Sequence, residues 1–215
     1  METSLALKRR ARRINRILAE AYPNAQAELN FTNTLELIVA TVLSAQCTDV
    51  RVNQVTPALF ERYPTAADYA HADPEELETY IRSTGFFRAK AKNLIGLGAM
   101  LDEDFGGEVP PRLEDLVKLP GVGRKTANVV LNTAFGQPVM AVDTHIFRVS
   151  NRTKIAPGKD VREVEDKLMR FVPKEFLMDA HHWLILHGRY TCKALKPQCK
   201  TCIINDLCEY PAKLM

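Results

Sequence analysis

The chain has 215 residues, of which 46% are hydrophobic and 26% are charged, a profile typical of a globular protein with one large domain or two small ones. No apolar run reaches the roughly 20 residues of a membrane span, and the basic N-terminus lacks the apolar stretch of a secretory signal. We therefore expect a compact cytoplasmic protein with no membrane partner. A net charge of +3 is too small to indicate a nucleic-acid partner by itself.

The first distinctive segment is basic: six of the nine residues from Lys8 to Arg16 are Lys or Arg. A solvated surface is the preferred interpretation of this run, and phosphate binding is the alternative.

Helical periodicity dominates the rest of the chain, and no segment alternates as a strand would. Apolar residues at helical spacing occupy 35–43, and prolines stand at or near most predicted helix ends. Further helices are predicted near residues 49–61, 74–82, 88–104, 112–118, 123–135, 144–151, 160–171 and 174–187. These short helices with brief connections predict an all-α fold.

The turn between two of these helices carries the sequence LPGVGRKTA, residues 119–127. Gly121 and Gly123 leave the backbone uncovered, and the helix that begins at Gly123 would present its N-terminal N–H groups to an anion such as a DNA phosphate. A tight turn without a ligand is the alternative. Lys125, in the first helical turn, could be a neutral amine nucleophile that forms a Schiff base, or it could simply bind phosphate.

Two further segments have possible chemical roles. Asp143 precedes a predicted helix and is placed to cap it, and His145 could contact phosphate or pack on that helix. Near the C-terminus, four cysteines with the spacing C-x6-C-x2-C-x5-C lie within 17 residues: Cys192, Cys199, Cys202 and Cys208. In a reducing compartment this set suits either zinc or an iron–sulfur cluster, and the spacing does not decide between them.

Several segments, in order, resemble one family. LPGVGRKTANVVL is similar to the helix-hairpin-helix of the base-excision DNA glycosylases, and AVDTHIFRVSNR to the segment with their essential aspartate. HGRYTCKALKPQCKTCIINDLC resembles the [4Fe–4S] loop of the bacterial endonuclease III branch, which LSAQCTDVRVN (43–53) and STGFFRAKAKNL (83–94) also match. The resemblance extends from about Arg12 to Tyr210.

The resemblance implies a bifunctional DNA glycosylase and abasic-site lyase that removes oxidised pyrimidines from duplex DNA. A flipped base would be released when Lys125 attacks the sugar C1′, with Asp143 assisting, and the resulting Schiff base would allow strand cleavage by β-elimination. The partner implied is double-stranded DNA with damaged bases or abasic sites. We expect a monomer in the cytoplasm, associated with the nucleoid.

The resemblance also implies site residues. The four cysteines would hold a [4Fe–4S] cluster that orders a DNA-binding loop, Gln46 would enter the DNA at the flipped site, and Phe86 would be the wedge in the opposite strand, where many relatives have an aliphatic residue. The residues expected to contact DNA are Gln46, Phe86, Gly121, Gly123, Arg124, His145, Lys193 and Lys196.

The implied fold is two helical domains that flank a DNA-binding cleft, with Lys125 and Asp143 facing each other across it. Residues 26–137 would form a six-helix domain with the hairpin at about 112–135. Residues 1–25 and 138–215 would form the cluster domain, with the cluster loop at 192–208.

Four other functions compete with this one. The adenine-mismatch glycosylases lack the catalytic lysine, carry a glutamate where this chain has Val42, and have an additional C-terminal domain. The oxidised-purine glycosylases usually lack the cluster. A non-catalytic DNA-binding module and a zinc-stabilised helical scaffold are the remaining alternatives, and the presence of Lys125 and Asp143 argues against the former.

Overall fold

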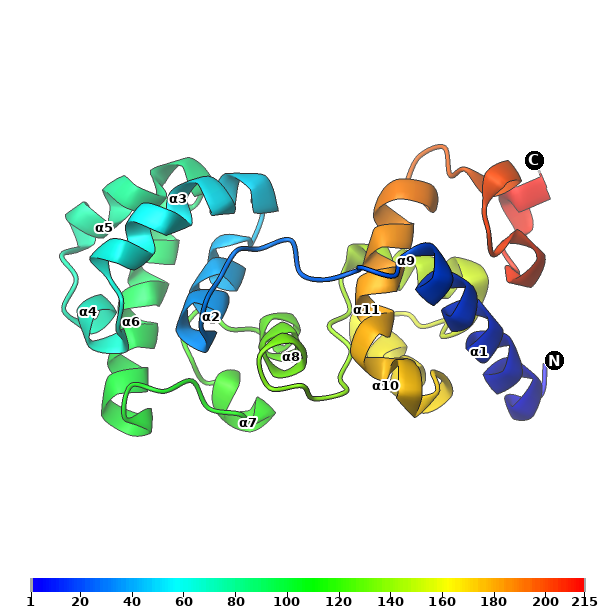
Figure 1. Cartoon of the computed structure of the whole chain (residues 1–215), viewed down its shortest axis with the longest axis horizontal. Helices are drawn as coiled ribbons and strands as arrows, with labels where there is room; N and C mark the ends of the chain where they lie inside the picture. Colours follow the sequence, from blue (N-terminus) through cyan, green and yellow to red (C-terminus); the bar gives the residue numbers. More distant parts are fainter. Residues whose placement is uncertain (1, 215) are drawn as a thin grey trace. The chain divides into compact units, whose positions relative to one another are not determined.

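The computed structural model describes residues 2–214, and all regular structure in that range is helical (Figure 1), which confirms the expected all-α class. The α-helices are α1 (Ser4–Ala21), α2 (Thr34–Leu43), α3 (Asp49–Arg62), α4 (Ala66–Ala70), α5 (Pro74–Ile81), α6 (Phe87–Phe105), α7 (Leu113–Leu116), α8 (Arg124–Thr133), α9 (Thr144–Thr153), α10 (Val161–Phe171) and α11 (Leu177–Leu186). A π-helix, η3 (His187–Thr191), extends α11, and 3-10 turns form η1 (Arg82–Thr84), η2 (Lys174–Phe176), η4 (Cys199–Thr201), η5 (Asn205–Leu207) and η6 (Pro211–Leu214).

The chain divides into two compact units. Unit 1 consists of Met1–Gln26 together with Gln137–Met215, and unit 2 is the continuous segment Ala27–Gly136. No helix in residues 2–214 combines the length and apolar character needed to cross a bilayer.

Unit 2 is built around α2. The last seven residues of this helix, from Leu37 to Leu43, are all buried, as expected for a helix that is apolar on every side. It packs against α3, α6 and α8, while α4 and α5 cover α6. Gly98 allows the approach of α6 to α4, because a Cβ added there would lie 2.6 Å from the carbonyl oxygen of Ala66.

Unit 1 joins the N-terminal helix to the C-terminal half of the chain. Helix α1 packs on α10 and α11, and α9 packs on both of these. Their shared core includes Ile14, Ile146, Leu168, Trp183 and Leu184, each of them buried. One apolar face of α1 therefore completes a core whose other residues lie more than 100 positions later in the sequence.

The observed helices depart from the predicted ones at a few places. Helix α8 begins at Arg124, because Gly123 has an extended backbone and serves as the N-cap. The helix predicted at 174–187 is divided into η2, α11 and the start of η3. Helix α4 was not predicted, because its five residues are too few for a periodic pattern. Pro57 lies within α3 on its exposed face.

Candidate functional site

The hairpin of unit 2 consists of α7, the turn at 117–123 and α8. Gly121 has φ +78°, in the left-handed region that favours glycine, and a Cβ there would lie 3.0 Å from Cβ of Asn93. Gly123 is exposed, and a Cβ there would meet nothing within 4 Å. Since Gly123 has no side chain to cap α8, the start of this helix is open to an external acceptor such as phosphate.

Lys125 is exposed in the first turn of α8, next to half-buried Arg124. Within residues 2–214, its amine has no hydrogen-bond or ion-pair partner. The amine is therefore accessible to a reactant that approaches the hairpin. Lys125 belongs to unit 2, and Asp143 belongs to unit 1.

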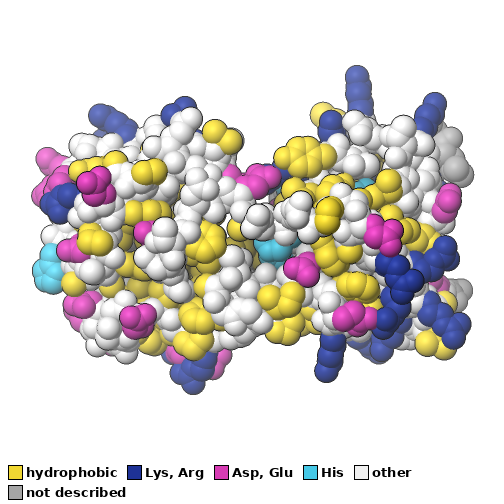
Figure 2. All heavy atoms as spheres, in the orientation of Figure 1, with side chains coloured by type: hydrophobic (Ala, Val, Ile, Leu, Met, Phe, Trp, Pro, Cys, Tyr) yellow, Lys and Arg dark blue, Asp and Glu magenta, His cyan; other side chains and the backbone are white. Residues whose placement is uncertain are grey.

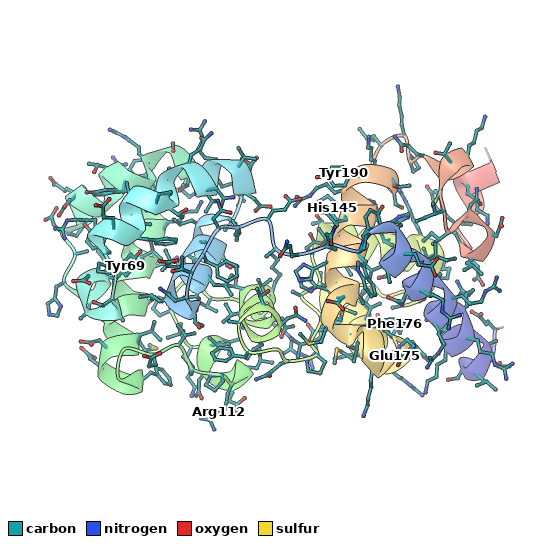
Figure 3. All side chains as sticks on the ribbon, in the orientation of Figure 1. Tyr69, Arg112, His145, Glu175, Phe176 and Tyr190 are labelled. Atoms are coloured by element: carbon teal, nitrogen blue, oxygen red, sulfur yellow. The ribbon has the colours of Figure 1, made fainter. Side chains whose placement is uncertain are left out.

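Asp143 caps α9. Its Oδ1 accepts a hydrogen bond of 2.8 Å from the backbone N–H of Ile146, as expected from its position before the helix. Half-buried His145 (Figure 3) accepts a hydrogen bond at Nδ1 from Arg148 Nη2 at 3.1 Å. One carboxylate oxygen of Asp143 therefore caps α9. His145 is held against the side chain of Arg148 on the same helix.

Two arginines on α9 hold the first part of the cysteine segment. Arg148 donates from Nε to the Cys192 carbonyl at 2.9 Å, and from Nη2 to the Gly188 carbonyl at 2.8 Å. One turn later, Arg152 donates to the carbonyls of Lys193 and Ala194 at 2.6 and 3.0 Å. This role of Arg148 and Arg152 was not predicted from the sequence, although their i, i+4 spacing places them on one helical face.

The four clustered cysteines are free thiols and line one cavity, together with His187, Ile204 and Tyr210. Burial raises the pKa of the Cys202 and Cys208 thiols, and the proximity of the other cysteines raises it further. Thiolates in such a place need a cationic group to neutralise them, so the donor set fits a metal centre.

The arrangement of the four thiols around the cavity bears on whether a single metal ion or an iron–sulfur cluster fits. Within the described residues, no three His, Cys, Asp or Glu side chains converge closely enough to hold one metal ion. In a [4Fe–4S] cluster each thiolate binds a different iron, so the sulfurs surround the centre instead of meeting at one point. Four thiols around a shared cavity are compatible with that arrangement. Lys193 and Lys196 are exposed on the segment between Cys192 and Cys199.

Gln46 and Phe86 lie on two turns of unit 2. Both side chains are exposed, that of Phe86 by 65%, and both backbones are left-handed, with φ of +53° and +48°. Such a conformation is uncommon for a residue other than glycine. The sequence gives no signal for it.

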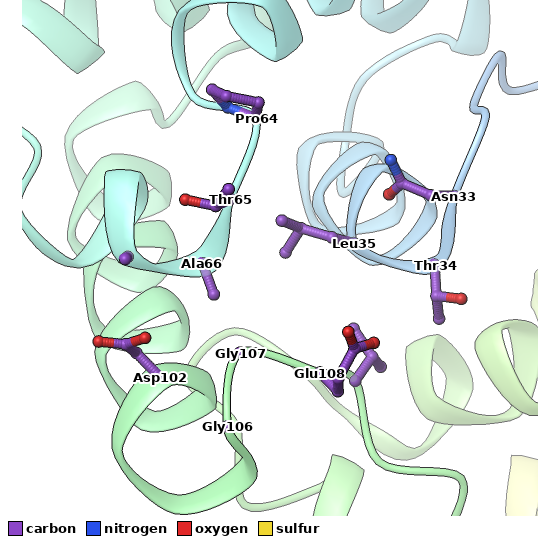
Figure 4. A pocket seen from close by; sticks show the side chains of 12 residues that line it. Asn33, Thr34, Leu35, Pro64, Thr65, Ala66, Asp102, Gly106, Gly107 and Glu108 are labelled. Atoms are coloured by element: carbon purple, nitrogen blue, oxygen red, sulfur yellow. The ribbon is translucent and has the colours of Figure 1, made fainter.

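A further cavity contains none of the predicted site residues. This cavity of about 520 Å³ in unit 2 (Figure 4) is lined by backbone and side chains of Asn33, Thr65, Asp102 and Gly106, among others.

The basic side chains of α1 fall into two groups, those that line a surface groove and the nearly buried Arg10. Lys8, Arg9 and Arg12 line a groove against the C-terminal end of α10, where Arg12 is paired with Glu175, and Figure 2 shows Lys and Arg side chains gathered over α1. Arg10 departs from the predicted solvated surface. Its side chain is only 11% exposed and donates hydrogen bonds to the carbonyls of Thr153 and Leu207 at 2.6 and 3.0 Å.

Comparison with known proteins gives consistent results. Residues 39–174 match the family model of the HhH-GPD superfamily base excision DNA repair proteins. The chain is 55% identical to endonuclease III of Escherichia coli strain K12 over 197 residues, which cover 92% of this chain and 93% of the relative. It is 53% identical to endonuclease III of Bacillus subtilis strain 168, over 89% of this chain and 88% of the relative.

Solved structures agree. A trapped covalent intermediate of endonuclease III with DNA superimposes with a TM-score of 0.91 at 49% identity, covering 97% of this chain and 99% of that one. A thermostable thymine-DNA glycosylase matches with a TM-score of 0.86 at 22% identity, over 95% of this chain and 98% of that one, and shows a shared fold.

Proposed function

Because the chain belongs to the HhH-GPD superfamily of base-excision repair proteins and aligns with endonuclease III over 92% of its length, we propose that it removes oxidised pyrimidines from duplex DNA. Its general activity is that of a DNA glycosylase with abasic-site lyase activity in base-excision repair, and its partner is DNA. We expect it to act as a monomer at the nucleoid.

Lys125 is the proposed nucleophile. Its unpaired amine attacks C1′ of the damaged nucleotide, the C1′–N bond breaks, and the base leaves with the bond electrons and takes up a proton. The amine then loses its protons as the C1′–O4′ bond breaks, which opens the sugar ring, leaves O4′ as a hydroxyl and gives an imine between Lys125 and C1′. The imine acidifies the C2′ proton, and its removal expels the 3′ phosphate by β-elimination. The observation that carries this proposal is the exposed, unpartnered amine of Lys125 in the first turn of an uncapped helix.

Asp143 is the proposed partner of Lys125. In its ionised form it can accept a proton from the lysine ammonium and stabilise positive charge that develops on the sugar. The cap it provides to α9 engages Oδ1, and a carboxylate can accept further hydrogen bonds at its other oxygen. The cap thus fixes the orientation of the carboxylate without preventing its use.

Cys192, Cys199, Cys202 and Cys208 are the proposed ligands of a [4Fe–4S] cluster. When bound, this group would supply structural cross-linking of the C-terminal segment. The arginines of α9 hold the backbone between Cys192 and Ala194, which supports a role for exposed Lys193 and Lys196 in binding DNA phosphates.

The other proposed DNA contacts belong to the hairpin, the two left-handed turns and α9. Gly121, Gly123 and Arg124 would receive a phosphate at the start of α8. Gln46 and Phe86 would fill the space that the flipped nucleotide leaves and separate the opposite strand, and His145 would contact the backbone.

Borohydride trapping on a duplex with an oxidised pyrimidine tests the proposal. We expect the wild type and Lys92→Gln, which alters an exposed lysine of α6, to form a covalent adduct, and Lys125→Gln to form none. An adduct with Lys125→Gln would move the nucleophile elsewhere. Failure of every variant to be trapped, with DNA binding intact, would remove the lyase mechanism.

A further inference from the structure

Lys90 is a buried lysine in the first turns of α6, with only 5% of its surface exposed. Its Nζ donates hydrogen bonds to two backbone carbonyls, those of Leu43 and Thr84, each at 2.8 Å. Leu43 lies 47 positions before Lys90 in the sequence. A single side chain thus joins two segments of unit 2 that are distant along the chain.

The first carbonyl belongs to the end of a helix. Leu43 is the last residue of α2, where helix carbonyls lack partners within the helix and where the dipole favours a positive charge. Gln46 stands three positions later, on the turn that joins α2 to α3. The Lys90 amine therefore fixes the point from which this turn leaves the core.

The second carbonyl precedes the other turn. Thr84 ends η1, and Gly85 and Phe86 follow it with φ of +73° and +48°. The backbone N–H of Lys90 also donates to the Phe86 carbonyl at 3.0 Å. Lys90 thereby holds the Phe86 turn on both sides, with its side chain before the turn and its backbone after it.

Left-handed backbone at residues other than glycine is strained, and it persists where the surroundings over-determine it. Gln46 and Phe86 share this strain, and they share Lys90 as the side chain that ties their turns to the core.

We propose that Lys90 is a positioning residue that sets the two turns at a fixed separation, so that Gln46 and Phe86 enter the duplex together when a nucleotide is flipped out. This inference rests on the proposed roles of Gln46 and Phe86. Separating base steps costs free energy, and side chains that are already held in place do not add the cost of ordering themselves.

The lysine is suited to this place. Burial lowers the pKa of Lys90, yet even the neutral amine has two N–H donors, one for each carbonyl. Methionine has a similar length but no donor, so Lys90→Met would leave two buried carbonyls without this partner. Lys92→Met is the matched control, because this lysine is exposed on the same helix and its loss changes the charge equally.

The test compares two substrates in single-turnover reactions of the full chain. On a duplex with an oxidised pyrimidine, Gln46 and Phe86 must enter the base stack. An abasic site in single-stranded DNA has no duplex for them to open. We expect Lys90→Met to slow the duplex reaction roughly tenfold or more, since misplacement near 1 Å can cost on the order of 100-fold, and to change the single-stranded reaction less than about twofold. Lys92→Met should change both reactions little.

If Lys90→Met lowers the rate equally on both substrates, Lys90 is a general structural residue and the proposal is overturned. An unchanged rate on the duplex would also overturn the proposal. If circular dichroism shows that Lys90→Met is unfolded, Lys90→Gln, which keeps one donor group, takes its place. The same results then support or overturn the proposal.

A second comparison separates this inference from the proposed function. In the Gln46→Ala/Phe86→Ala background, Lys90→Met should have almost no further effect on the duplex reaction, because its action passes through those two side chains. If Gln46→Ala and Phe86→Ala leave the duplex rate unchanged, the proposed roles of those residues fail. If they slow it and Lys90→Met does not, only the inference about Lys90 fails.

Discussion

Gly121 and Gly123 stand two positions apart in the hairpin, and the structure gives them different reasons to be glycine. Gly121 has a left-handed backbone, and a Cβ added there would crowd Asn93, whereas Gly123 has φ of −84° and open space around its Cβ position. The fold itself therefore favours glycine at position 121. Gly123 leaves the start of α8 open, where we propose that a phosphate binds.

We expect Gly121→Ala to lower the free energy of unfolding by about 1–2 kcal/mol, since alanine is strained at positive φ. Gly123→Ala should leave it within about 0.5 kcal/mol and weaken binding to an abasic-site duplex several-fold, because the new methyl group stands where a phosphate would bind. Thermal unfolding and fluorescence anisotropy measure the two effects. Wild-type affinity in Gly123→Ala would contradict phosphate binding at this turn.

At the same scale, the roles of some residues can be predicted from the sequence and those of others cannot. The glycine spacing and the four cysteines stand out because each pattern is local. Lys90 falls on the same helical face as buried Leu94 and Leu97, but its hydrogen bonds cannot be predicted from this pattern, because one acceptor is a carbonyl 47 positions away. The left-handed turns at Gln46 and Phe86 depend in the same way on the packing around them.

At the scale of elements, α7 is the most dependent on its neighbours. Four residues are too few for a stable helix, and Asp115, in this helix, is bound by Lys118 at 2.9 Å and by Arg112 at 2.6 Å. These two cations hold the pKa of the Asp115 carboxyl below its ordinary value of 3.8. The carboxyl therefore stabilises the folded state above pH 3.8, and this contribution disappears as the pH falls through the lowered pKa.

Asp115→Asn should accordingly lower the melting temperature at pH 7, and the difference from the wild type should shrink as the pH is taken below 3.8. Melts followed by circular dichroism across this range measure it, with Asp102→Asn on the exposed surface of α6 as the control. A difference that stays constant with pH would mean that Asp115 acts through packing alone.

Element prediction succeeded where periodicity was long, and it failed where tertiary contacts decide. The predicted helix at 160–171 corresponds to α10 (Val161–Phe171), which has a capping aspartate and a strongly amphipathic pattern. The helix predicted at 174–187 is divided, and its end passes into the π-helix η3. There Gly188 lies so close to α9 that a Cβ would come within 2.8 Å of Cβ of His145, a contact invisible in the local sequence.

At the scale of the molecule, the unfolding of unit 1 can be measured separately from that of the whole chain. The chain has one tryptophan, Trp183, which is buried in the core of unit 1 and meets Phe176 edge to face at 5.9 Å. Its fluorescence therefore reports on unit 1, while far-ultraviolet circular dichroism reports on the helices of both units.

If the four cysteines hold a cluster, its removal should lower the fluorescence transition by about 5 °C or more, equivalent to roughly 1 kcal/mol for a unit of this size, and leave part of the dichroism transition in place. The holoprotein melted under the same conditions is the reference. Coincident shifts of the two transitions would show that the units unfold as one cooperative body, and no shift would remove the structural role of the cysteines.

The division of unit 1 between the two ends of the chain has a consequence for synthesis. Helix α1 is synthesised before its packing partner α11, which begins more than 150 residues later, about 8–30 s at ~5–20 residues per second. Unit 2, being continuous, can fold in that interval. Until then α11 cannot cover the apolar face of α1, and we expect the exposed Lys and Arg side chains on the opposite face of α1 to favour solubility of the nascent chain.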